Sequence, residues 1–167
     1  DDAQSAYRQA VEMNPTEPDP YVGLAKVYLA RHKPDQALLA YRQAVALVPK
    51  DPAIHSGMGL IQLQTGNLAG AASSFARALQ LDANFPLAHY GQGELNRQQR
   101  DFLAAANAFK HAIELDSLLV EPHIGLARIN AYEGRVKEAR AALQQALTFA
   151  GENLEALALL AALQPSP

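Results

Sequence analysis

Residues 18–51 read PDPYVGLAKVYLARHKPDQALLAYRQAVALVPKD, and this pattern is repeated end to end along most of the chain. The copies are residues 18–51, 52–85, 86–119 and 120–153. Their starts are spaced by 34 residues (52 − 18, 86 − 52, 120 − 86), without insertion or deletion. In the first copy a large apolar residue, Tyr41, lies between Ala37 and Ala44, and every other copy keeps this arrangement. Such a period is typical of a solenoid, in which each repeat buries its apolar face against its neighbours.

Composition restricts the classes of partner. The chain has 167 residues, a net charge of −3 and only 14 scattered Lys and Arg, which argues against nucleic acid because phosphate binding needs a clustered basic face. Without cysteine there are no disulfides or thiolate metal sites. The longest nearly uncharged apolar stretch, Leu154 to Leu163, is shorter than the roughly 20 residues of a membrane span, so no direct membrane insertion is expected. This composition is compatible with a location in either the cytoplasm or the periplasm.

Each copy divides into two segments with helical apolar periodicity, at about residues 19–31 and 34–47 in the first copy. Asp19-Pro20 and Asp51-Pro52 place a capping carboxylate before a proline, which predicts helix starts at these points. No segment alternates with the period of a strand. We therefore expect an all-α fold of about ten helices: one, four pairs and one.

The pattern resembles the tetratricopeptide repeat family over nearly the whole chain. The family's signature positions are filled in the first copy by Tyr21, Leu24, Ala25, Tyr28, Ala37, Tyr41, Ala44 and Pro49. The resemblance implies a right-handed superhelical solenoid of helix–turn–helix repeats, forming a single array over residues 1–167. Residues 1–17 are expected to be a half repeat with the second helix only, residues 154–164 a terminal helix and residues 165–167 a tail. Because the chain starts within a helical pattern, we expect it to be a segment or a processed product.

Histidines and amides recur at single positions of the repeat. His55, His89 and His123 are equivalent, but stacked helices about 8–10 Å apart cannot easily bring them to one metal ion, so they are interpreted as packing residues. The position of Tyr28 holds an amide in the later copies: Gln62, Asn96 and Asn130. We expect these amides to form hydrogen bonds between helices or to face solvent.

Glycine also recurs at one position of all four copies, although it costs a helix interior about 1 kcal/mol relative to alanine. These glycines are Gly23, Gly57, Gly91 and Gly125. By resemblance this position lines the concave wall of the superhelix, so glycine would open the groove to a ligand. Close packing of the helices, without any ligand, explains the recurrence of glycine at this position equally well.

Other positions face the groove by resemblance and give the candidate partner-binding residues. These are Val22, Lys26, Leu29, Leu60, Leu63, Tyr90, Glu94, Arg97, Ile124, Arg128 and Tyr132. Tyr and Arg are enriched at interface hot spots, and they lie in the second half of the chain. The carboxylate clamp by which some family members hold chaperone termini is disfavoured, since Val22, Ala53, Gly57 and Gly125 replace its polar residues.

No nucleophile–base pair, ligand cluster or phosphate loop has usable spacing, so we expect no catalysis, no cofactor and no metal. The sequence predicts a non-catalytic scaffold that binds a peptide or protein segment in its concave groove, as part of a larger, bacterial-type protein. One alternative is self-association through apolar terminal helices, with Tyr7, Leu157 and Leu160 as contacts, giving a homo-oligomer. Another is the substrate-recruiting arm of an enzyme or an envelope assembly machine.

Overall fold

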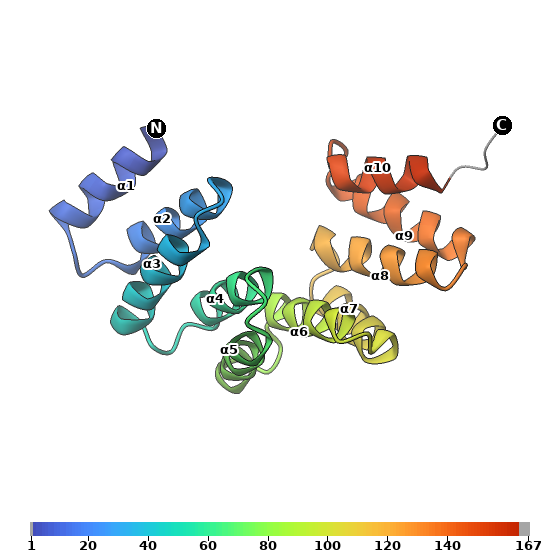
Figure 1. The fold of residues 1–167 in the computed structure, drawn as a ribbon, viewed down its shortest axis with the longest axis horizontal. Helices are drawn as coiled ribbons and strands as arrows, with labels where there is room; N and C mark the ends of the chain where they lie inside the picture. Colours follow the sequence, from blue (N-terminus) through green and yellow to red (C-terminus); the bar gives the residue numbers. More distant parts are fainter. Residues whose placement is uncertain (1, 164–167) are drawn as a thin grey trace. The chain divides into compact units, whose positions relative to one another are not determined.

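The computed structural model describes residues 2–163, and these form α-helices with no strand (Figure 1). The helices are α1 (Asp2–Met13), α2 (Pro18–Ala30), α3 (Pro34–Leu47), α4 (Pro52–Gln64), α5 (Leu68–Leu81), α6 (Pro86–Gln98), α7 (Phe102–Leu115), α8 (Val120–Tyr132), α9 (Val136–Phe149) and α10 (Leu154–Ala162). The all-α prediction is confirmed. None of these helices is both long and apolar enough to cross a membrane.

The helix starts follow local chemistry. Proline begins α2, α3, α4 and α6, where its missing N–H costs nothing because the first turn has no intrahelical partner. Asp51 caps α4, since its carboxylate accepts hydrogen bonds from the backbone N–H groups of Ala53 at 2.7 Å and Ile54 at 3.4 Å. The predicted cap at Asp19 is wrong: α2 already begins at Pro18, so Asp19 lies within its first turn.

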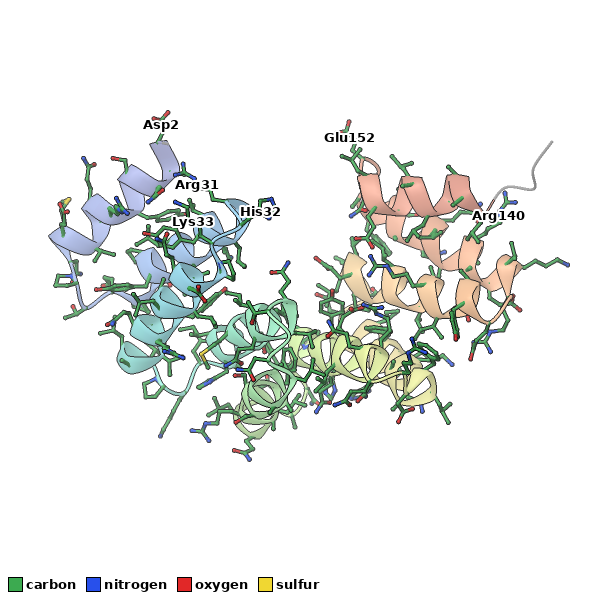
Figure 2. All side chains as sticks on the ribbon, in the orientation of Figure 1. Asp2, Arg31, His32, Lys33, Arg140 and Glu152 are labelled. Carbon is green, nitrogen blue, oxygen red and sulfur yellow. The ribbon has the colours of Figure 1, made fainter. Side chains whose placement is uncertain are left out.

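The turn between the two helices of each repeat contains one residue in the left-handed region. These equivalent residues are His32 (φ 56°), Gly66 (φ 78°), Arg100 (φ 64°) and Gly134 (φ 75°). Glycine adopts this conformation freely, whereas for other residues the left-handed conformation costs roughly 1–2 kcal/mol of free energy. The second and fourth repeats therefore use the favourable residue, and the first and third do not. Figure 2 shows His32 at the turn that follows α2.

The chain divides into two compact units between Ala88 and His89. In the N-terminal unit, α2 packs against α3 and α4 against α5, and α1 packs on α2. Its core consists of Leu24, Ala25, Ala37, Ala40, Tyr41, Ala44, Ile54 and Ile61. Small alanines at the helix contacts let the backbones approach closely.

The C-terminal unit has its core around Phe109 and Leu143, both fully buried. The Phe109 ring lies between α6 and α8: a Cβ built on Gly93 would be 2.5 Å from it, and one on Gly125 would be 2.6 Å from it. Two glycines on neighbouring helices thus make room for one ring. This arrangement positions α6 and α8, which carry most of the surface described next.

Candidate functional site

Charged side chains of α6 form a fixed pair. The guanidinium of Arg97 donates to the carboxylate of Glu94, from Nη2 at 2.8 Å and from Nε at 3.1 and 3.2 Å. Glu94 is only 7% exposed, and a buried carboxylate needs a hydrogen-bonding partner of opposite charge. Arg97 is that partner. The same hydrogen bond raises the pKa of Arg97, which stays a cation at every physiological pH. Arg97 is thereby held in one orientation.

A second pair joins α8 to α10, because Arg128 forms an ion pair with Glu155. Between this pair and α6 lies a cleft of about 220 Å³, which we name the A-helix cleft. It is lined by Tyr90, Glu94, Glu121, Ile124, Gly125, Arg128, Asn153 and Glu155. The Tyr90 ring packs on Phe109 at a centroid distance of 6.0 Å. Burial, followed by the nearby carboxylates of Glu94 and Glu121, raises the pKa of the Tyr90 hydroxyl, which therefore remains a neutral donor.

A larger cleft of about 430 Å³ lies at the turn of the third repeat, and we name it the Arg100 cleft. It is lined by Arg97, Gln98, Arg100, Phe102, Arg128, Ile129 and Tyr132. The Phe102 and Tyr132 rings contact each other at a centroid distance of 4.7 Å. Tyr132 is 70% exposed, so its ring presents apolar area and a hydroxyl to an approaching partner.

Arg128 also borders a third cleft, which is almost entirely apolar and has a volume of about 160 Å³. Its other lining residues are Ala127, Ala131, Leu143, Leu159, Ala162 and Leu163. The three clefts therefore meet at Arg128. One side chain separates a polar cleft, an arginine-rich cleft and an apolar cleft in the C-terminal unit.

The predicted partner-binding residues divide into accessible and buried ones. Tyr90, Arg97, Arg128 and Tyr132 come together around the clefts of the C-terminal unit, and Glu94 lines the A-helix cleft although it is only 7% exposed. Ile124 lines the A-helix cleft but is only 4% exposed, and Leu63 is only 6% exposed, so both serve mainly as core residues. Their helices turn these side chains toward the neighbouring helix rather than toward solvent.

In the N-terminal unit, the predicted residues do not form one surface cluster. Lys26 is exposed, whereas Val22 is half-buried against the core. Leu60 is half-buried. Leu29 lines a cleft of about 310 Å³ with His32, Pro34, Gln64 and Thr65, which we name the Leu29 cleft.

The recurrent glycines are explained by aromatic packing at three of the four positions. A Cβ on Gly23 would overlap the Tyr7 ring, one on Gly57 the Tyr41 ring, and one on Gly125 the Phe109 ring. The space beside each glycine is thus filled by the protein's own side chain. This geometry supports the helix-packing explanation over an opening for a ligand at Gly23, Gly57 and Gly125.

Two of the three recurrent histidines, His55 and His123, bond to the backbone. Nε2 of His55 is 3.0 Å from the carbonyl oxygen of Pro49, and Nε2 of His123 is 3.2 Å from that of Ser117. Both rings are buried, and each ties the start of a repeat to the loop before it. Among residues 2–163 no group of three His, Asp or Glu side chains is placed to hold a metal ion.

The amides at the Tyr28 position act locally. The carbonyl oxygen of the Gln62 side chain accepts a hydrogen bond from Ser74 at 2.7 Å, which links α4 to α5. The corresponding oxygen of Asn130 accepts from Nε of Arg135 at 3.0 Å, in the turn after α8. The Gln62 bond joins two helices, as the sequence predicted, whereas the Asn130 bond lies within a single turn. Both amides therefore have a hydrogen-bond partner in the protein.

Sequence reasoning missed Arg100, Phe102 and Glu155. Arg100 falls where the second and fourth repeats have Gly66 and Gly134, and this departure in a turn is the signal that could have identified it. Phe102 and Glu155 give no such signal, because their roles depend on contacts with Tyr132 and Arg128 in other helices.

Comparison with known proteins agrees with the geometry. A family model described as tetratricopeptide repeat matches residues 22–86 and 90–153. Among curated proteins, no significant sequence match was found. The fold is similar to that of TTC0263, a thermophilic TPR protein from Thermus thermophilus, at 21% identity and a TM-score of 0.83, over 96% of this chain and 88% of that one.

Two further solved structures share the fold. PilF of Pseudomonas aeruginosa is 21% identical, with a TM-score of 0.72 over 94% of this chain and 72% of that one. YrrB, described as a TPR protein with an unusual peptide-binding site, is 20% identical, with a TM-score of 0.62 over 96% of this chain and 83% of that one. With its family model, its 34-residue period and its paired helices, the chain belongs to the tetratricopeptide repeat family.

Proposed function

We propose that this chain is a non-catalytic scaffold that binds a peptide or protein segment on the clefts of its C-terminal unit. Tetratricopeptide repeats indicate protein–protein interaction, and the clefts supply a specific surface for it. The observation that carries this function is the position of Arg128, which borders three clefts of different character and is oriented by Glu155. Arginine and tyrosine beside apolar clefts are the residue types that dominate interface hot spots.

Selection of binders from an unbiased library of random peptides displayed on phage, with residues 1–167 immobilised, tests this function. The affinity of each selected peptide is then measured by fluorescence anisotropy. Arg128→Ala is expected to weaken binding by about 1–2 kcal/mol, while the free energy of unfolding hardly changes because the Arg128–Glu155 pair lies at the surface. Tyr90→Ala is a poorer test than Arg128→Ala, since the Tyr90 ring packs on Phe109.

Arg77→Ala is the matched control, because Arg77 is exposed on α5 and donates a hydrogen bond to the exposed side chain of Gln80. Equal affinity of wild type, Arg128→Ala and Arg77→Ala would move the binding surface away from the clefts. A library that yields no binder would argue against peptide binding altogether.

Self-association through α10 is the second candidate function. Leu154 is 81% exposed and Leu157 is 43% exposed, so this helix carries apolar side chains in solvent. Leu160 packs against the core of the C-terminal unit, and Tyr7 covers Gly23, so both are poorer test positions. Sedimentation should show an oligomer for the wild type and a monomer for a Leu154→Lys, Leu157→Lys double variant. A wild type that stays monomeric at high concentration would contradict this candidate.

A further inference from the structure

Resting on the proposed function, we infer that the Arg100 cleft selects partner segments in which an acidic side chain lies next to an aromatic or large aliphatic one. The occupant supplies an Asp or Glu carboxylate for the arginines, and an apolar side chain for the Phe102–Tyr132 ring pair. The A-helix cleft is not required for this selection.

Charge distinguishes the Arg100 cleft from its surroundings. The seven residues that line it include three arginines, Arg97, Arg100 and Arg128, and no carboxylate. Glu94 and Glu155 neutralise and orient two of these cations from outside the cleft. A chain with a net charge of −3 thus keeps a local positive excess at one cleft, which attracts an anionic segment.

Arg100 is the arginine of this cleft whose donors are available. Its guanidinium forms no hydrogen bond or ion pair with any other side chain or carbonyl in residues 2–163. Five donors in a planar fork are therefore left for a ligand, and this fork matches a carboxylate bidentately. Arg97 and Arg128 can add single donors without losing their own partners, because a guanidinium has more N–H groups than either pair uses.

The backbone of Arg100 lies at φ 64°, in a turn where two other repeats place glycine. His32 in the first repeat has the same conformation, so the backbone alone does not single out Arg100. It does provide a means to separate binding from stability, because replacement by glycine removes the side chain and relieves the backbone at once.

The Phe102 and Tyr132 rings contact each other and form an apolar wall beside the arginines. Because Tyr132 is exposed, this wall is open to a ligand. Aromatic rings supply large contact area with few rotatable bonds to immobilise. A carboxylate alone would leave this wall in water, and an apolar side chain alone would leave the Arg100 guanidinium unpaired. A segment that carries both groups side by side satisfies the whole cleft.

The test runs the random-peptide selection in parallel on wild type, Arg100→Gly and His32→Gly. Wild type and His32→Gly are expected to enrich acidic residues next to aromatic or large aliphatic ones, and Arg100→Gly is expected to lose this enrichment. Both glycine variants should unfold at a higher urea concentration than wild type. A variant that is more stable yet binds less cannot be explained by damage to the fold.

Affinity is then measured with two fluorescein-labelled peptides: one with the central order glutamate–phenylalanine–glutamate, and one with glutamine at both glutamate positions. The acidic peptide should bind wild type at least about tenfold more tightly than Arg100→Gly, as expected for one charge-assisted hydrogen bond, and its binding should weaken with added salt. Equal affinity for the two peptides, or enrichment without acidic residues, would overturn the inference and leave the proposed function intact. A library without any binder would overturn both.

Discussion

The Leu29 cleft and the Arg100 cleft occupy equivalent places in two pairs of repeats, yet they differ in chemistry. The equivalent residues are Leu29 and Arg97, His32 and Arg100, Pro34 and Phe102, and Gln64 and Tyr132. Both clefts have the same left-handed turn, with φ of 56° and 64°. Backbone geometry is thus shared, whereas arginine, phenylalanine and tyrosine side chains line only the second cleft. The repeat therefore fixes where a cleft forms and leaves its selectivity to a few side chains.

The largest expected difference between the two units concerns Glu94 and its equivalent, Lys26. Glu94→Ala should lower the free energy of unfolding by about 1.5–3 kcal/mol, because it removes hydrogen bonds between charged groups and leaves Arg97 unpaired. Lys26→Ala should change it by less than about 0.5 kcal/mol, since Lys26 is exposed. Urea unfolding of both variants measures the difference. Equal effects would mean that the pair on α6 contributes no more than a surface residue.

A second contrast concerns the glycines beside aromatic rings. Gly125→Ala should cost about 1–2 kcal/mol, because Phe109 is fully buried and Gly93 confines its ring from the other side. Gly23→Ala should be nearly neutral, since Tyr7 is 39% exposed and its ring can move outward while alanine favours the helix. Thermal unfolding compares the two. A large loss of stability for Gly23→Ala would show that α1 is held as rigidly as the interior.

The smallest effects belong to the turns. Gly66→Ala and Gly134→Ala should each cost about 1 kcal/mol, purely through backbone strain, because nothing lies within 4 Å of the added Cβ. The measurement is again the midpoint of urea unfolding, with Gly151→Ala as control, since Gly151 has no positive φ and its added Cβ would meet only an ordinary contact at 3.7 Å. Turns that tolerate alanine without loss would contradict the expected stabilisation of Arg100→Gly as well.

Much of the fold could be predicted from sequence because a helical solenoid depends on local patterns. The period, the alanines and the prolines specify helix type and order, and the start of α4 at Pro52 follows directly. The first residue of α2 is ambiguous in the sequence, because either Pro18 or Pro20 could begin this helix.

The site could be predicted only in part. The family's repeat assigns Tyr90, Arg97, Arg128 and Tyr132 to one face, and the structure places all four at clefts of the C-terminal unit, while their role in binding stays a prediction. Leu63 was also predicted to face the groove and is only 6% exposed, because a residue at the edge of a helical stripe is turned inward or outward by its neighbours. The partners that orient the arginines could not be read from spacing, since Glu155 reaches Arg128 from another helix.

The Phe109 ring, enclosed between Gly93 and Gly125, also has a spectroscopic consequence. Protons close to an aromatic ring experience its ring current, so the α-protons of both glycines should resonate away from the crowded region of the proton spectrum. Gly125 additionally lines the A-helix cleft. Its resonance should therefore respond to an occupant of that cleft, whereas the Gly93 resonance reports on the buried side of the same ring. The protein contains its own paired probe of occupancy and integrity, readable without any attached label.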